Sequence, residues 1–208
     1  MKKIFIPLIE DFEIKKETLE RINKELPEKI AILYIIQYEK VAKELIKQLK
    51  GKKITKFSQT LGCANPKIPK DTSAILLIGE SEFHSNSLAY ESKKEVYVLE
   101  KNILKKVEKS EIEKLEKKEK IAYLNFLNND EIGVLITTKP GQARLSRALE
   151  LKNQIKNKKI YFFLANEVQT KEFENFGLKS WINTACPRID LEDNRIINMN
   201  VVSKYLNL

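Results

Sequence analysis

Residue types that carry specialised chemistry are scarce in this chain. Its 208 residues include two cysteines, one histidine and one tryptophan. Two cysteines and one histidine cannot supply the paired C-x₂-C spacing of a structural zinc site. A structural disulfide is disfavoured in a reducing cytoplasm, although proteins of hyperthermophiles are an exception. Two inert buried thiols are the plain alternative, so the residues around each cysteine have to decide between these interpretations.

Long apolar runs are also missing. No apolar stretch approaches the length that crosses a bilayer. The apolar segment 4–9 contains Pro7 and is closed by Glu10 and Asp11, so it is too short for the core of a signal peptide. We therefore expect a cytoplasmic protein with no membrane contact.

The chain has an excess of basic residues, 38 against 29 acidic ones, and a formal net charge of +9. Such an excess can steer a protein to nucleic acid or to another acidic partner. Between residues 101 and 120, however, lysines and glutamates alternate, as on the solvated face of a helix. The sequence has no block of pure Lys/Arg and no arginine–aromatic interleaving. We expect no direct nucleic-acid binding, and a basic RNA-binding protein is the weakest alternative.

Short apolar segments typical of strands alternate with amphipathic helical segments along the chain. This rhythm is typical of βαβ units and a mostly parallel sheet. The segment 29–37 is nearly continuous in apolar residues, which indicates a strand covered on both faces. Because both halves repeat the rhythm, we expect an α/β protein of two tandem related domains, residues 1–104 and 105–208. Each is predicted to be a mostly parallel sheet flanked by helices.

The individual elements follow from the same patterns. The expected strands cover residues 3–8, 29–37, 54–57, 74–78, 95–99, 132–137, 159–164 and 179–183. The expected helices cover residues 17–26, 39–49, 105–127, 141–156 and 170–176. Residues 80–89 are expected to form a polar loop, and the C-terminal tail shows no clear signal.

The least common residues gather where the predicted strands end. In α/β sheets, ligands bind outside the carboxyl ends of the strands. Four such ends carry unusual segments: residues 61–63, 79–84, 137–144 and 183–188. This gathering is the main evidence from the residues themselves for a single active site.

The segment TTKPGQAR, residues 137–144, joins an expected strand to an expected helix. Gly141 permits close approach to the backbone, and a helix N-terminus presents free N–H groups and the positive end of the helix dipole. Lys139 and Arg144 add positive charge. These features predict a site for a carboxylate or phosphate, with a capped helix and solvated bases as the alternative. The spacing is not that of a P-loop.

The segment NTACPR, residues 183–188, places Cys186 just beyond a predicted strand, before a proline and near Arg188. A thiolate in this environment is suited to ligate a soft metal. A nucleophilic cysteine would need a base nearby, and the only histidine is His84. Both interpretations stay open at the level of the residues.

Taken together, the motifs resemble a known family. They are Gly62-Cys63, AILLIG at 74–79 running on to Phe83-His84, TKPGQAR at 138–144 and NTACPR at 183–188. Their order and spacing resemble the 2-(3-amino-3-carboxypropyl)histidine synthase family, which performs the first step of diphthamide biosynthesis. The resemblance covers essentially the whole chain, and it matches the middle and C-terminal domains of a three-domain family.

The resemblance implies three related α/β domains, each donating one cysteine to a central 4Fe–4S cluster. It implies that the open iron binds S-adenosylmethionine, whose reductive cleavage gives a 3-amino-3-carboxypropyl radical that attacks a histidine of translation elongation factor 2. Cys63 and Cys186 are then metal ligands, and no catalytic residue is assigned. The residues expected to bind cofactor or substrate are His84, Lys139, Gly141, Gln142, Arg144 and Arg188.

The chain also departs from the family. It lacks the family's N-terminal domain and first cysteine, Tyr38 follows Gln37 where the family usually has a histidine, and Ser85 replaces a common proline. A split gene, a non-catalytic partner or scaffold subunit, and a truncated form of the chain are the explanations. Each predicts that the chain alone is inactive, and that an exposed apolar face or sheet edge contacts a partner in a dimer or higher assembly.

Overall fold

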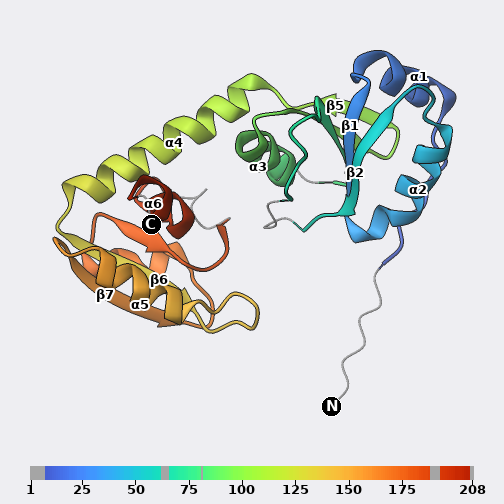
Figure 1. The fold of residues 1–208 in the computed structure, drawn as a ribbon. Coiled ribbons are helices and arrows are strands. Elements are labelled where there is room, and N and C mark those ends of the chain that lie inside the picture. The colour runs from blue at the N-terminus through green and yellow to red at the C-terminus, as the bar shows by residue number, and fades with distance from the viewer. Residues whose placement is uncertain (1–7, 62–65, 81, 188–192, 207–208) are drawn as a thin grey trace. The chain divides into compact units, whose positions relative to one another are not determined.

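The computed structural model describes residues 8–61, 66–80, 82–187 and 193–206 (Figure 1). The chain divides into two compact units, with the boundary inside helix α4 (Lys109–Asn128), between Glu113 and Lys114. We call the part up to Glu113 the N-terminal unit and the part from Lys114 the C-terminal unit. Among the described residues, no helix combines the length and the apolar character needed to cross a bilayer. The assignment of residues 1–104 and 105–208 to two domains of the family stays a prediction.

The N-terminal unit contains a sheet in the order β2-β1-β3-β4-β5. Neighbours are parallel from β2 to β4, and β5 runs antiparallel to β4. The strands are β1 (Lys29–Tyr34), β2 (Lys53–Gln59), β3 (Ala74–Ile78), β4 (Glu95–Glu100) and β5 (Ile103–Lys106). The helices are α1 (Lys16–Glu25), the 3₁₀ turn η1 (Ile36–Tyr38), α2 (Glu39–Gln48) and α3 (Glu82–Ser92).

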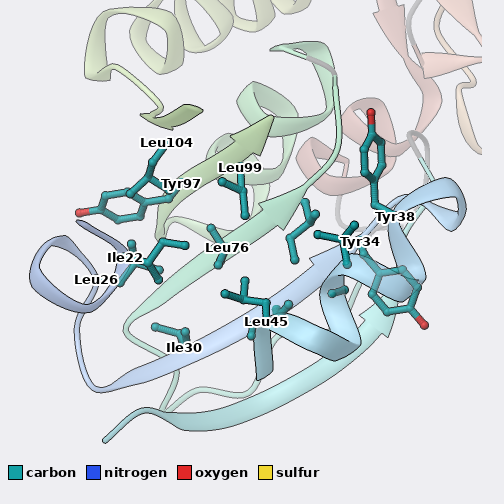
Figure 2. Close-up of a cluster of buried hydrophobic side chains, with 14 of the residues drawn as sticks. Ile22, Leu26, Ile30, Tyr34, Tyr38, Leu45, Leu76, Tyr97, Leu99 and Leu104 are labelled. Atoms are coloured by element: carbon teal, nitrogen blue, oxygen red, sulfur yellow. The ribbon is translucent and has the colours of Figure 1, made fainter. Parts of the chain in front are cut away.

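Helices cover both faces of this sheet, which explains the continuous apolar segments in the sequence. Ile30 and Ile32 of β1 pack with α1 and α2, in the cluster that Figure 2 shows. The alternate residues Ala31 and Leu33 pack against α3 on the other face. Since both faces are buried, every position of β3 can be apolar, and all five of its residues are buried.

The C-terminal unit contains a sheet in the order β7-β6-β8-β9, and each pair of neighbours is parallel. Its strands are β6 (Glu131–Thr137), β7 (Lys159–Ala165), β8 (Trp181–Asn183) and β9 (Ile196–Asn198). Besides α4, its helices are α5 (Leu145–Gln154), the 3₁₀ segment η2 (Thr170–Phe176) and α6 (Met199–Tyr205). Residues of α4, α5 and α6 share one core cluster with β6, while Phe173 of η2 packs with Leu135 and Trp181 in another.

The two units repeat one plan, as expected from the sequence. The strand order β2-β1-β3-β4 of the first recurs as β7-β6-β8-β9 in the second. The start of the second strand is tied to the start of the first in the same way in both. Lys53 N donates to Glu28 O over 2.8 Å, and Lys159 N donates to Asp130 O over 2.7 Å.

In each unit, the lysine just before the second strand hydrogen-bonds to the C-terminal end of the helix that precedes the first strand. Lys52 Nζ donates to Asn23 O and Leu26 O at the end of α1. Lys158 Nζ donates to Leu127 O and Asn129 O at the end of α4. Carbonyls at a helix end lack intrahelical partners, and a cation also interacts favourably with the helix dipole there. The shared device confirms two related α/β folds in tandem.

Several expected boundaries are wrong. Residues 80–89, expected as a loop, include most of α3, because Leu88 and Ala89 give that polar segment enough buried contact to be helical. The helix expected from residue 105 begins at Lys109, because β5 pairs with β4 first. No pattern in the C-terminal tail predicts β9 or α6. The expected strand 3–8 lies outside the described residues, apart from Leu8.

Candidate functional site

Two of the predicted motifs meet at one edge of the C-terminal sheet. Residues 138–144 follow the carboxyl end of β6, and residues 184–187 follow the carboxyl end of β8. β6 and β8 are parallel neighbours, with Leu135 opposite Asn183. After β6 the chain passes through α5 to β7 on one side, whereas β8 and β9 lie on the other. Such a switch in strand order is where open α/β sheets bind ligands.

The loop that carries Cys186 is held by two asparagines. Asn183 is 2% exposed, and its Oδ1 accepts a bond from Ala185 N over 2.9 Å. Its Nδ2 donates to Cys186 O over 2.8 Å and to Asn198 Oδ1 over 2.7 Å. Asn198 Nδ2 donates in turn to Pro187 O over 3.3 Å. Side chains from β8 and β9 therefore fix the backbone on both sides of the cysteine.

Thr184 joins the same loop to β6. Its backbone N and its Oγ1 both donate to Leu135 O, over 3.1 and 2.8 Å, and the residue is 2% exposed. Cys186 itself is half-buried and its thiol is free. A free thiol on a half-buried residue, in a loop held by these hydrogen bonds, fits a ligand for a soft metal or an iron–sulfur cluster.

The described residues contain only part of a ligand set. Within them, no group of three His, Cys, Asp or Glu side chains could hold a metal ion. Cys63 and Arg188, both expected at the site, lie outside the described residues. Their roles as a metal ligand and a cofactor-binding residue stay predictions.

The loop after β6 turns sharply before its helix begins. Gly141 has a φ of +82°, which favours glycine. Gln142 N and Ala143 N both donate to Lys139 O, over 3.1 and 3.0 Å. The expectation of a helix from Gly141 with free N–H groups is therefore wrong, because α5 starts only at Leu145 and these two donors are used within the turn.

Lys139 is nevertheless held where it can bind a carboxylate. Its Nζ donates to Glu167 Oε1 over 2.7 Å, and Glu167 follows β7 at the same sheet edge. The hydrogen bond from Lys139, and then its charge, keep the pKa of Glu167 below its usual value. Thr137 Oγ1 fixes the turn by donating to Asn166 O over 2.9 Å and accepting from Lys139 N over 3.1 Å.

The predicted site residues thus fall into two groups. Lys139, Gly141, Gln142, Arg144 and Cys186 gather at the carboxyl edge of the C-terminal sheet. His84 belongs to the N-terminal unit, in the first turn of α3, close after the carboxyl end of β3. Sequence motifs do not point to Glu167 or Asn198, because each lies at the end of a different strand from the motif that it contacts.

The corresponding edge of the N-terminal sheet carries a buried polar contact. Tyr38, 4% exposed, follows β1, and its hydroxyl donates to Glu80 Oε1 over 2.8 Å. Burial and the neighbouring Glu80 carboxylate raise the pKa of Tyr38 well above its usual value. Gly79, between β3 and Glu80, lies against Ile35, whose Cδ1 would be 2.5 Å from an added Cβ. The tyrosine that departs from the family pattern is therefore a buried hydrogen-bond donor.

The model of the family described as "Putative diphthamide synthesis protein" matches residues 1–205. This chain belongs to that family. The 2-(3-amino-3-carboxypropyl)histidine synthase of Methanocaldococcus jannaschii is 27% identical over 208 residues, which cover 93% of this chain and 57% of that protein. The synthase of the same name from Pyrococcus horikoshii is 24% identical over 205 residues, with 91% and 60% covered. The resemblance expected from the four motifs is confirmed.

Solved structures of the family have the same fold. The crystal structure of Dph2 from Pyrococcus horikoshii matches with a TM-score of 0.77 at 24% identity, covering 92% of this chain and 60% of that one. Its crystal structure with a 4Fe-4S cluster matches with a TM-score of 0.75 at 25% identity, covering 92% and 61%. The expected α/β fold is confirmed. The chain spans about three-fifths of the length of these members of the diphthamide synthesis family.

Proposed function

We propose that this chain is a component of a diphthamide synthase. The complete enzyme transfers the 3-amino-3-carboxypropyl group of S-adenosylmethionine to a histidine of translation elongation factor 2. Membership of the family over residues 1–205 and a solved family member that carries a 4Fe-4S cluster support the proposal. The observation that carries it is the free, half-buried thiol of Cys186 on a loop braced by Asn183 and Asn198.

In this proposal Cys186 and Cys63 each hold one iron of a 4Fe–4S cluster, and a third cysteine comes from another polypeptide. When bound, the cluster supplies the electron that cleaves S-adenosylmethionine and an open iron for its methionine part. The protein sets the geometry, because the loop bonds at Asn183 and Thr184 hold the thiol in place at the sheet edge.

The loop after β6 binds the substrate carboxylate in this account. Lys139 and Arg144 bring positive charge to the sheet edge that also carries Cys186. Orientation of the substrate by such a contact decides which carbon–sulfur bond faces the reacting centre. The Glu167 carboxylate already bonds Lys139, so a substrate carboxylate competes with Glu167 for the same ammonium group.

This competition predicts that substitutions of Lys139 and Glu167 change the affinity for S-adenosylmethionine in opposite directions. Lys139→Met is expected to weaken S-adenosylmethionine binding about threefold, and Glu167→Gln to strengthen it about twofold, since exposed ion pairs contribute roughly 0.2–1 kcal/mol. Isothermal titration of the complete synthase measures both affinities, with Lys156→Met as an exposed control in the same unit. Two unchanged affinities would show that Lys139 does not bind the carboxylate.

A transfer assay tests the proposed function itself. The native assembly is purified without oxygen, reduced with dithionite, and given elongation factor 2 and S-adenosylmethionine labelled in the methionine carboxyl carbon. We expect the label to appear on one histidine of the factor, only when this chain is present. An assembly that transfers label equally well after this chain is removed would refute the proposal.

A non-catalytic scaffold is the second candidate. An exposed apolar residue on the edge strand of the C-terminal sheet favours it. Strand β7 at the end of its sheet, where Leu164 is 57% exposed, is available for a partner chain or for elongation factor 2. Binding that survives loss of both cysteines, with no iron in the assembly, would favour the scaffold.

A further inference from the structure

One of the two asparagines that hold the Cys186 loop lies outside the NTACPR motif. Asn183 ends β8 and belongs to the motif, whereas Asn198 ends β9, twelve positions beyond Cys186. The two asparagines are register partners in the parallel pair β8–β9. Their side chains meet at the carboxyl edge of the sheet, where Asn183 Nδ2 donates to Asn198 Oδ1 over 2.7 Å.

The Asn183 carboxamide uses both of its N–H donors and also its oxygen. A carboxamide has two N–H donors and an acceptor oxygen. Both kinds are engaged, since Nδ2 donates to Cys186 O and Asn198 Oδ1 and Oδ1 accepts from Ala185 N. A buried amide whose donors and oxygen are all engaged contributes to a single defined arrangement of its surroundings.

Asn198 binds the carbonyl of the residue that follows the cysteine. Its Nδ2 donates to Pro187 O over 3.3 Å, while Asn183 Nδ2 donates to Cys186 O over 2.8 Å. Two successive carbonyls are thus bound by two neighbouring carboxamides. Rotation of the peptide between Cys186 and Pro187 would break the bond to Cys186 O, and the second bond holds the Pro187 carbonyl, so the backbone that follows the Cys186 Cα is restrained at two successive carbonyls.

The structure before Asn198 is itself well fixed. Arg195 N and Nε donate to Asp193 Oδ1 over 2.8 and 3.0 Å, and this contact shapes the turn that enters β9. Ile196 and Ile197 are buried, at 3% and 1% exposure. Asn198 is therefore presented by a strand whose position the core determines.

We propose that Asn198 is a positioning residue for Cys186, which acts through Asn183 and Pro187 to fix the thiolate that ligates the cluster. The inference rests on the proposed function. Groups that hydrogen-bond to a metal-ligating residue orient that residue. Their loss typically changes metal affinity by roughly 10–100-fold. The acceptors here are carbonyl oxygens, which explains why amides rather than carboxylates occupy both strand ends.

The test uses the native assembly, purified without oxygen, with three variants of this chain. Asn198→Ala removes the side-chain bonds with Asn183 and Pro187. Asn198→Asp has the same shape and can still accept from Asn183, but it cannot donate to Pro187 O. Asn200→Ala, an exposed position in α6, is the matched control. The readouts are the electron paramagnetic resonance spectrum of the reduced cluster and the rate of iron loss to a chelator.

We expect Asn198→Ala to shift the resonance g-values and to speed iron loss about tenfold, with a smaller change in Asn198→Asp and none in Asn200→Ala. If Asn198→Ala does not fold, the isosteric Asn198→Asp variant decides the question alone. Spectra and loss rates equal to those of the unsubstituted assembly would overturn the positioning role and leave the proposed function intact. Absence of a cluster from the unsubstituted assembly would overturn the proposed function, and the positioning role with it.

Discussion

Replacement of Cys186 by serine is expected to strip iron from the complete synthase and to lower transfer activity by at least about a hundredfold. A serine hydroxyl stays protonated at neutral pH and is a hard ligand, whereas iron–sulfur clusters are held by thiolates. The loop itself should keep its shape, because its bonds come from Asn183, Thr184 and Asn198 and none involves the sulfur. Iron content and single-turnover transfer measure the two effects.

The Cys186→Ser variant distinguishes a thiol that ligates the cluster from a thiol that only stabilises the fold. Serine differs from cysteine by one atom, so the thermal unfolding midpoint of the variant should stay within a few degrees of the parent's. Asn157→Ser, an exposed change in the same unit, serves as the control. A Cys186→Ser assembly with full iron content and full turnover would show that the thiol is not a ligand. Cys63→Ser is expected to behave as Cys186→Ser does.

Gly133→Ala is expected to lower the free energy of unfolding by about 3 kcal/mol. An added Cβ would lie 2.1 Å from Trp181 Cε3, far inside van der Waals contact. The indole has no room to retreat, because Phe163 and Phe173 pack against it at centroid distances of 4.9 and 5.5 Å. Its Nε1 also donates to Leu178 O over 3.2 Å. Urea denaturation measures the loss.

Gly177→Ala is the matched control for that prediction. Gly177 lies in the same unit with a φ of +67°, and nothing is within 4 Å of an added Cβ. Its substitution should cost only the backbone strain of a left-handed conformation, about 1 kcal/mol. The pair of variants therefore separates packing from backbone strain. Equal losses in Gly133→Ala and Gly177→Ala would contradict the packing explanation.

The sheet could be predicted from the sequence because both of its faces are covered. A strand buried on two sides must be apolar at nearly every position, and for that reason the apolar pattern predicts β3 at its observed bounds. Helix α3 gives the opposite case. Its Ser and Asn residues indicate a loop, and the contacts of Leu88 and Ala89 with β1 and β3 are not visible in the chain order.

The site could be predicted in part. Cys186 and Lys139 were placed at strand ends because parallel strands bring their carboxyl ends to one edge, and the sheet does so. Asn198 and Glu167 could not be found in the same way, because each contacts the site from the end of another strand through side-chain bonds that the chain order does not reveal. A local motif shows which residues a loop contains. The residues that hydrogen-bond to that loop come from neighbouring strands, and the motif does not show them.

In the proposed function this chain takes part in modifying a histidine of elongation factor 2, so the modification of that histidine in cells is the most direct test. Elongation factor 2 is isolated from source cells that lack this chain, from the same cells with the chain restored, and from cells with Cys186→Ser restored. Mass spectrometry of the peptide that carries the histidine should show the 3-amino-3-carboxypropyl group, or the product of the later steps of diphthamide biosynthesis, only where the unsubstituted chain is present. A fully modified histidine in cells without the chain would contradict the account.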